Sequence, residues 1–289
     1  RDWKKTSIPG FLPELAGNDA YNYDGSVTVR VPVPGEAIAG LKQGEAWYIS
    51  TGFISDVVRL YCNEVLLAGA GEIEPYRSGY RSLRAYYTQG CLREKENYFY
   101  IHIHGKKGSA IHIMDPGAEP ETGSADVLTK KYNRDELINY ALLAIYLVTG
   151  LYHLQLFNKR RKDVYNLFFG LFAVFLASYW FSRTHTAFEL FDSMQMVRKK
   201  FEYIVLFNLG QMLLFFLALY FRGKYSKTAI AAAVFGVILG IVALAGNHWL
   251  MDKALQAWQM SVLPLMLYII FFIVREAWRG QRDAYFLAG

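Results

Sequence analysis

Two neighbouring stretches decide the fold of this chain: residues 203–221 read YIVLFNLGQMLLFFLALYF, and residues 228–246 read TAIAAAVFGVILGIVALAG. Neither contains Asp, Glu, Lys or Arg. At a rise of about 1.5 Å per residue, a helix of this length crosses the ~30 Å hydrocarbon core of a bilayer. A surface helix of a soluble protein keeps a polar face, whereas these stretches are apolar all round. Both therefore predict transmembrane helices.

Three further uncharged apolar stretches, 137–157, 164–181 and 257–274, extend the pattern. We expect five complete spans in a transmembrane region of residues 134–289, with membrane lipid as their partner. Pro264 is expected to kink the last of these spans. A polar turn follows, and the apolar residues from Ala284 onward predict the start of a further span. The sequence thus predicts a multi-pass membrane protein.

The Lys and Arg residues that flank the spans predict the orientation. Ten of them follow the first, third and fifth spans, and five lie in the other two loops. The richer side faces the cytoplasm, which places residues 1 to about 133 outside. The cluster from Arg198 to Lys200 argues in the opposite direction. Because the chain starts at Arg1, an exported N-terminal part implies a signal peptide that has been removed.

Composition narrows the function classes. The net charge is +6, and the loops on the cytoplasmic side largely account for it. No basic stripe is left for the exported part, so nucleic-acid binding is disfavoured. The hydrophobic fraction of 53% is high for a globular protein and is concentrated in the second half of the chain.

Residues 1–114 predict a β-sandwich or jelly roll. Alternation of apolar and polar residues gives the strand candidates 27–33, 46–51, 57–62, 98–104 and 110–114. The last two are expected to pair as a hairpin around the turn 105–109. Glycine- and proline-containing turns separate the strands, and no helical period is present. Residues 115–133 are expected to form a polar connector to the membrane region.

Three segments resemble the galactose-binding-like jelly rolls, a group that includes sugar-binding modules of glycoside hydrolases. They are residues 3–10 (WKKTSIPG), residues 56–63 (DVVRLYCN) and residues 92–98 (LREKENY). The last of these segments stands before an alternating strand. Glu64 stands where those modules have the Gly of an Asn-Gly hairpin. The resemblance implies a jelly-roll ectodomain of carbohydrate-binding type.

A second resemblance concerns the membrane region, residues 133–289. Residues 150–157 (GLYHLQLF), followed by basic residues and by residues 165–170 (YNLFFG), resemble the first loop of the bacterial seven-transmembrane receptors with diverse intracellular signalling modules. This resemblance implies an extracytoplasmic jelly roll and seven helices in the bacterial inner membrane. It also implies a cytoplasmic output module, such as a histidine kinase, nucleotide cyclase, diguanylate cyclase or phosphatase.

The segment 74–87 is the main candidate for ligand binding. Its aromatic and basic residues include Tyr76, Arg77, Tyr80, Arg81 and Arg84. Tyr rings stack on sugar rings, and Arg binds carboxylate or phosphate groups through two parallel hydrogen bonds. A loop that binds a sugar-like or acidic molecule has this composition, and so does a structural loop that lies on the sandwich. Both interpretations stay open.

His102, His104 and His112 are weaker candidates, for a metal site on the predicted hairpin. His residues at i and i+2 share one face of a strand, and a third across the hairpin completes a set of ligands. The isoleucines between them occupy the core face, so solvated polar positions are the commoner outcome. No metal or other cofactor is expected.

Cys62 and Cys91 are the only cysteines. In an exported domain two such residues can form a disulfide. Cys62 also alternates with Val58 and Leu60, as a buried core residue does. A disulfide and two buried thiols remain alternatives.

Polar residues within the spans are expected to join helices through hydrogen bonds; they are Asn139, His153, Gln155, Asn166, Asn208 and Gln211. A transport pathway or proton relay usually carries an ionisable residue at mid-depth, and these spans have no Asp, Glu or Lys. Gly236 and Gly240 form a GxxxG motif, extended by Ala232, which lets another helix approach closely, either within the bundle or in a homodimer.

No nucleophile–base arrangement, phosphate loop or dinucleotide fingerprint is visible in the sequence. The leading hypothesis is a receptor that binds a small extracytoplasmic ligand, such as a carbohydrate, and signals through its helical bundle. Two alternatives stay open. One is a transporter or membrane-embedded enzyme with an accessory β-domain, and the other is an envelope protein that binds polysaccharide without signalling.

Overall fold

The computed structural model describes residues 3, 10–11, 23–54, 56–79, 81–107, 112–113, 120–191, 194–281 and 283–284. Of residues 10–11, 81 and 112–113 it describes the backbone only. The chain divides into two compact units. Unit 1 comprises Arg1–Leu137, His185–Arg198 and Asn247–Trp249, and unit 2 comprises Ile138–Thr184, Lys199–Gly246 and Leu250–Gly289.

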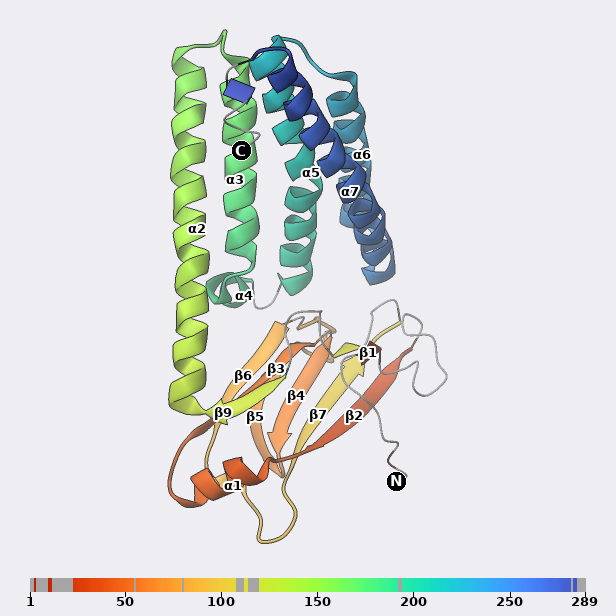
Figure 1. Ribbon diagram of the computed structural model, residues 1–289. Coiled ribbons are helices and arrows are strands. Elements are labelled where there is room, and N and C mark those ends of the chain that lie inside the picture. The colour runs from red at the N-terminus through yellow and green to blue at the C-terminus, as the bar shows by residue number, and fades with distance from the viewer. Residues whose placement is uncertain are drawn as a thin grey trace. The chain divides into compact units, whose positions relative to one another are not determined.

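Unit 1 is built on a sandwich of two antiparallel sheets (Figure 1). The four-stranded sheet has the order β2-β7-β4-β5, with β2 at Gly25–Pro32, β7 at Tyr98–Gly105, β4 at Val57–Cys62 and β5 at Val65–Ala70. The five-stranded sheet has the order β1-β8-β3-β6, with β9 also paired to β3. Its strands are β1 at Gly10–Phe11, β8 at His112–Ile113, β3 at Trp47–Ile54, β6 at Arg81–Tyr87 and β9 at Glu121–Ser124.

Alternation along the strands creates the core between the sheets. Val29 of β2 and Ile101 and Ile103 of β7 are buried, while their neighbours Arg30 and His102 are exposed. This is the inward–outward pattern of a sheet with one packed face. The β-sandwich predicted from the sequence is therefore confirmed, and β4 has the predicted bounds.

The predicted hairpin between residues 98–104 and 110–114 is wrong. Strand β7 pairs with β2 and β4 in one sheet, and β8 pairs with β1 and β3 in the other. The chain therefore crosses from one sheet to the other between β7 and β8, as connections in a sandwich often do. Spacing within the sequence does not distinguish this crossing from a hairpin.

Two helical segments interrupt the part expected to be all β. Helix α1 (Gly35–Lys42) buries Ala37 and Leu41 against the sandwich core, and the 3-10 helix η2 spans Gln89–Cys91. The expected connector 115–133 is also structured where it is described, because β9 and the first residues of helix α2 lie in it. Eight residues in α1 give too few turns for a recognisable helical period.

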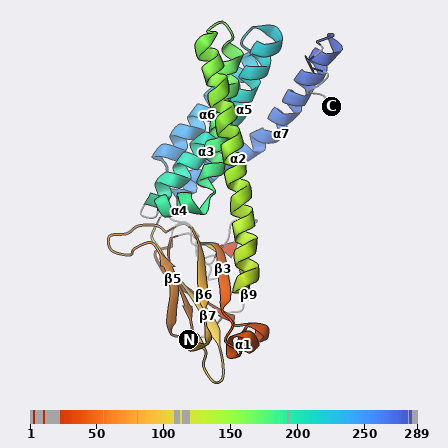
Figure 2. The ribbon, with the colours of Figure 1, turned by 90° about the vertical axis from the view of Figure 1, so that its left-hand side faces the viewer.

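The membrane region contains the helices α2 (Ala125–Lys159), α3 (Val164–Ser182), α4 (His185–Leu190), α5 (Gln195–Arg222), α6 (Lys227–Ala245) and α7 (His248–Trp278). All except the short α4 are long and apolar enough to cross a membrane (Figure 2). These five helices contain the predicted spans, apart from the last residue of the fourth. The predicted start of a further span lies mostly outside the described residues.

Close packing between α2 and α3 depends on two glycines. A Cβ atom on Gly170 would lie 2.8 Å from Leu154 and 3.1 Å from the Gly150 carbonyl oxygen. One helical turn away, the Nδ1 atom of His153 lies 2.8 Å from Oδ1 of Asn166. The expected interhelical hydrogen bond is thus present for this pair. Asn208 instead donates to the Ile204 carbonyl of its own helix.

Gly236, the first glycine of the GxxxG motif of α6, faces α5 within the bundle. A Cβ on Gly236 would lie 2.3 Å from Nε2 of Gln211 and 2.7 Å from the Phe207 carbonyl oxygen. The same atom on Gly240 would meet nothing within 4 Å. Of the two glycines, Gly236 is the one that permits close helix packing.

Candidate ligand site and its connection to the first transmembrane helix

One end of the sandwich brings together part of the predicted ligand segment. Tyr76 donates a hydrogen bond of 2.7 Å to Oδ1 of Asp56, which lies in the turn between β3 and β4. The Nζ atom of Lys106, just after β7, lies 5.6 Å from the centre of the Tyr76 ring. Asp56 is fully buried and has a φ of 73°, a conformation that non-glycine residues adopt mainly where surrounding structure imposes it.

The loop that carries Tyr76 is closed by its own backbone. The Glu72 amide donates to the Arg77 carbonyl at 2.9 Å, and the Arg77 amide donates to the Glu72 carbonyl at 2.8 Å. At the base, a Cβ on Gly79 would lie 2.4 Å from the backbone of Ala70 and of Gly71. Gly79 therefore permits a close approach of two backbone segments, and the loop is held in one shape.

Arg77 is the basic residue of this loop, and its side chain is exposed. Its guanidinium lies 3.6 Å from the Glu72 carboxylate, and both side chains are about half exposed. An exposed pair of this kind contributes little to stability, roughly 0–1 kcal/mol, so Arg77 can exchange this partner for an anionic ligand at small cost. Tyr80 lies outside the described residues, and of Arg81 only the backbone, in β6, is described.

Arg84 does not join this site. It lies on β6, on the face of the five-stranded sheet opposite the core, where its guanidinium stacks 4.1 Å from the centre of the Tyr132 ring. The segment 74–87 was expected to be one loop, and its second half is a strand. Arg84 pairs with Ser50 within β3, whereas Tyr76 bonds to Asp56 beyond the end of that strand.

Arg84 belongs to an aromatic cluster that joins the sheet to α2; its members are Tyr48, Arg84, Tyr86 and Tyr132. The rings of Tyr48 and Tyr86 are 4.8 Å apart edge to face, and those of Tyr48 and Tyr132 are 5.6 Å apart. The Tyr86 hydroxyl lies 3.1 Å from the hydroxyl of Thr129, one turn before Tyr132. Burial raises the pKa of Tyr48 to about 12, although the charge of Arg84 acts in the opposite direction.

Strand β9 continues directly into α2. Ser124 is the last residue of β9, paired with Trp47 of β3, and Ala125 is the first residue of the helix. The Ala125 amide donates to the Ala46 carbonyl at 3.1 Å, and Lys131 forms a 2.6 Å ion pair with Glu121. The first turns of the membrane-crossing helix are therefore fixed to the sheet by backbone and side-chain bonds.

The three histidines do not gather. His102 and His104 lie on β7, whereas the backbone of His112 lies in the other sheet, on β8. The Nδ1 atoms of His102 and His104 lie 2.5 Å from the Thr28 hydroxyl and 3.0 Å from the Ser26 hydroxyl. The residues that the structure describes contain no group of three potential metal ligands.

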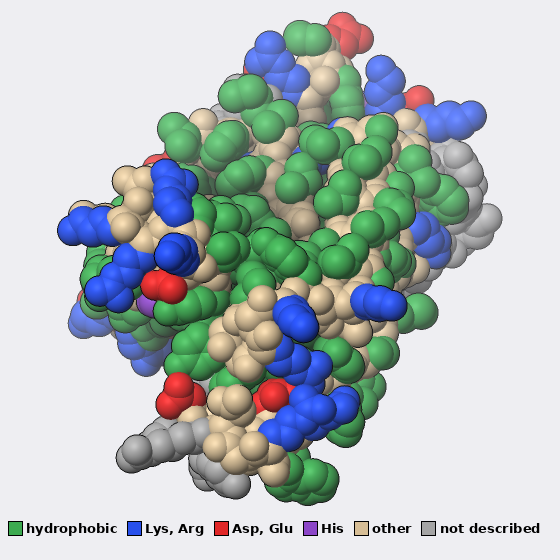
Figure 3. All heavy atoms as spheres, turned by 90° about the horizontal axis from the view of Figure 1, so that it is seen from above, with side chains coloured by type: hydrophobic (Ala, Val, Ile, Leu, Met, Phe, Trp, Pro, Cys, Tyr) green, Lys and Arg blue, Asp and Glu red, His purple; other side chains and the backbone are tan. Residues whose placement is uncertain are grey.

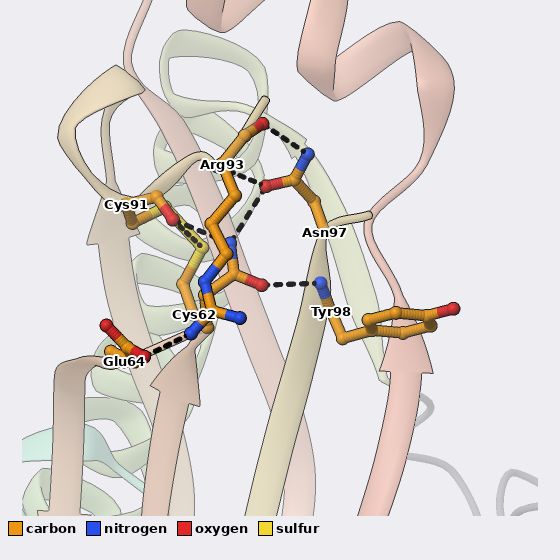
Figure 4. Close-up of polar contacts among 7 residues, drawn as sticks. Cys62, Glu64, Cys91, Arg93, Asn97 and Tyr98 are labelled. Carbon is orange, nitrogen blue, oxygen red and sulfur yellow. Dashed lines mark hydrogen bonds and ion pairs between the residues drawn. A yellow bond between two sulfur atoms is a disulfide. The ribbon is translucent and has the colours of Figure 1, made fainter. Parts of the chain in front are cut away.

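The end of the sandwich near α1 is closed by covalent and polar contacts (Figure 4). Cys62 and Cys91 form a disulfide with their Cα atoms 5.7 Å apart, and both residues are buried. The side-chain amide of Asn63 donates to the Cys91 carbonyl at 2.7 Å and to Oδ1 of Asn97 at 2.8 Å. Of the two alternatives left open by the sequence, the structure shows the disulfide and not two buried thiols, and the bridged pair also occupies core positions.

Basic residues surround one end of the helical bundle in unit 2. Lys159, Arg160, Arg161 and Lys162 are exposed there, as are Lys224, Lys227, Arg275 and Arg279. Figure 3 looks down on this end and shows groups of Lys and Arg side chains among the hydrophobic ones. Of the basic residues that argued for the opposite orientation, Arg198 and Lys199 are buried, and Lys199 lies 3.7 Å from Asp252.

Comparison with known proteins identifies the family of the membrane region. Comparison with curated proteins gives no match. The family model described as 7TM diverse intracellular signalling matches residues 135–289, which is more than half of the chain. The matched region contains the apolar part of α2 and all of α3, α5, α6 and α7. The chain is therefore a multi-pass membrane protein that belongs to the 7TM diverse intracellular signalling family.

Proposed function

We propose that this chain is a receptor of the bacterial inner membrane, whose β-sandwich lies outside the cytoplasm and binds a small ligand. Ligand binding is passed to the helical bundle through β9 and α2. The carrying observation is the direct transition from Ser124 to Ala125, with no linker between sheet and helix. Because the aromatic cluster and the Lys131–Glu121 pair tie the helix to the sheet, a shift of the sheet displaces the start of α2.

The proposed ligand site is the sandwich end around Tyr76 and Arg77. Tyr76 offers a ring face, Arg77 and Lys106 offer positive charge, and the closed loop holds the backbone of Tyr76 and Arg77 in place. Rigid placement lowers the entropy lost on binding. The chemistry favours a sugar-like or acidic small molecule, because Arg binds carboxylates through two parallel hydrogen bonds and aromatic rings stack on sugars.

Two observations support the extracytoplasmic placement. The exposed Lys and Arg residues gather at the end of the bundle that carries the α2–α3 and α5–α6 connections, as expected of a cytoplasmic face. The Cys62–Cys91 disulfide fits an oxidising compartment, since thiols in the bacterial cytoplasm are kept reduced.

To test whether ligand binding is passed to the helical bundle, a single cysteine is introduced for labelling. Asn158→Cys, near the far end of α2, carries an environment-sensitive fluorophore, while the native cysteines are bridged. Ligands are first found by thermal shift of the full chain in detergent, with a panel of sugars and sugar acids. We expect a bound ligand to change the fluorescence of the labelled Asn158→Cys protein. In the variant Arg84→Ala/Tyr132→Ala, which lacks the stacked pair, the ligand should still bind but the change should be smaller.

The site is tested separately. Arg77→Ala is expected to weaken ligand binding by about 1.5–3 kcal/mol, the usual range for a hydrogen bond to a charged group. Lys130→Ala is the matched control, because Lys130 is also an exposed cation and forms an ion pair with Asp126 of its own helix. Equal affinities of Arg77→Ala and the control would remove the loop from the proposal. If the fluorescence response is unchanged in Arg84→Ala/Tyr132→Ala, the aromatic cluster does not pass ligand binding from the sheet to α2.

A further inference from the structure

The outer face of the four-stranded sheet carries a row of aromatic side chains. Arg30 of β2 and Tyr61 of β4 both pair with Tyr100 of the central strand β7, and Tyr98 lies two residues before Tyr100 on the same face. The rings of Tyr98 and Tyr100 have centres 6.2 Å apart. All three tyrosines are partly exposed, so ring surface is available to a ligand.

Arg30 is placed by two of these rings. Its guanidinium carbon lies 4.6 Å from the centre of the Tyr98 ring and 4.7 Å from that of Trp3, and the side chain is exposed. Stacking engages the flat faces of a guanidinium, while its hydrogen bonds leave through the edge. Arg30 can therefore remain stacked and still donate to a carboxylate. We call Trp3, Arg30, Tyr61, Tyr98 and Tyr100 the aromatic face.

The strands that carry the aromatic face contain no acidic residue. The basic residues of strands β2, β4, β5 and β7 are Arg30, Arg59, His102 and His104. Arg59 is occupied, since it donates to the carbonyls of Val58, Ala70 and Gly71 at 2.8–3.0 Å. A neighbouring carboxylate, Glu96, accepts a 3.2 Å hydrogen bond from the Tyr98 hydroxyl.

The opposite sheet differs in the use of its aromatic rings. Its outer face carries the cluster that contacts Tyr132 of α2, so those aromatic rings are already used in packing. On the four-stranded sheet, the tyrosine rings are partly exposed and Arg30 is exposed. Ring faces beside a fixed cation are complementary to sugars that carry carboxylates.

We propose that the aromatic face binds an acidic oligosaccharide, with sugar rings on Tyr98 and Tyr100 and a uronate carboxylate on Arg30. This inference rests on the proposed function only for the placement of the sandwich outside the cytoplasm. It adds a second binding surface, separated from the Tyr76–Arg77 loop along the length of β7. An extended ligand suits this surface because the rings follow one another along a strand and across to its neighbours.

The experiment uses the full chain in a detergent that has no sugar head group. The probe is an oligogalacturonate, and a cello-oligosaccharide of equal length is the neutral control. Binding is measured by calorimetry for the wild-type chain, Arg30→Ala, Tyr100→Ala and Arg77→Ala, with the melting temperature of each as a fold control. If Arg30→Ala melts lower than the wild type, Arg30→Gln, which keeps most of the apolar stem, replaces it.

We expect the wild-type chain to bind the oligogalacturonate and to bind the neutral control more weakly. Loss of the Arg30 charge should weaken binding about tenfold or more, as for other hydrogen bonds between charged groups. Tyr100→Ala should also weaken binding, and Arg77→Ala should leave it unchanged. Absence of oligogalacturonate binding, or equal binding by the wild type and the Arg30 variant, would overturn the inference.

Two other results separate this inference from the proposed function. If Arg77→Ala loses the probe and the Arg30 variant keeps it, the acidic ligand belongs to the Tyr76–Arg77 loop and the aromatic face fails. If light scattering shows a dimer that the Arg30 variant disrupts, and no oligosaccharide binds, the face contacts a second copy of this chain, which also overturns the inference.

Discussion

Tyr48 illustrates how a single strand residue acquires its role from its surroundings. In the sequence it is one of many tyrosines in a β-rich segment. In the fold it lies on the outer side of β3, buried between Tyr86 and Tyr132, so it contacts both sheet and helix. The loss of hydration around its hydroxyl favours the neutral form and raises its pKa from 10 to about 12.

This pKa predicts a pH dependence of stability. A group whose pKa is higher in the folded state contributes fully below its unfolded pKa, and the contribution is lost as pH rises toward the folded pKa. We therefore expect the melting temperature of the wild-type chain to fall more steeply than that of Tyr48→Phe between pH 10 and about 12. Melting curves of both proteins across that range provide the measurement. Parallel curves would show that Tyr48 ionises as in the unfolded chain.

The Cys62–Cys91 bridge gives a second prediction at the scale of residues. The two cysteines are 29 residues apart, and a bridge over such a loop contributes about 3–4 kcal/mol by the chain-entropy estimate. We expect Cys62→Ala/Cys91→Ala to melt several degrees lower than the wild type, and reductant to lower only the wild-type melting temperature. Two thiols titrated in the purified, unreduced protein would contradict the bridge.

At the scale of elements, the glycines of α6 differ although they belong to one motif. Gly236 faces Gln211 and the backbone of Phe207 on α5, whereas Gly240 has open space where a Cβ would be. The GxxxG pattern identifies both positions but does not show which of them a neighbouring helix approaches. The geometry of α5 and α6 decides this.

The same two glycines form a matched pair for mutation. Gly236→Ala is expected to destabilise the bundle by about 1–3 kcal/mol, as overpacking does when backbone must move. Gly240→Ala should be neutral or slightly stabilising, because alanine favours a helix by up to ~1 kcal/mol over glycine. Thermal unfolding in detergent distinguishes them. Equal melting temperatures would mean that α5 and α6 are further apart than described.

The sequence patterns missed two strands, β6 and β9. Strand β6 lies within the Tyr- and Arg-rich segment, and its alternation is hidden because its outward residues, Arg84 and Tyr86, are as large as its inward ones. Strand β9 has only four residues, and its partner β3 is distant in sequence. Both strands are defined by pairing, which depends on contacts that a local window does not contain.

At the scale of the whole molecule, the orientation is the main prediction. A cysteine at Asn158, beside the exposed basic residues after α2, should be protected from an impermeant thiol reagent in intact cells. A cysteine at Asn247, between α6 and α7, should react. The expected difference follows from the positive-inside rule. Labelling after cell lysis is the control for access, and the reverse pattern would overturn both the orientation and the proposed receptor function.

The sequence by itself determined the membrane spans, the two-part organisation, the core strands β2, β4 and β7, and the family resemblance that the match to residues 135–289 confirms. These features are local: uncharged runs of span length and alternation along a strand can be read in one window. The tertiary structure decided that β7 and β8 lie in different sheets, that Arg84 belongs with Tyr132 rather than Arg77, and that β9 leads without a linker into α2. Each of these depends on which distant strands pair, and pairing is set by the packing of the whole sandwich around one core.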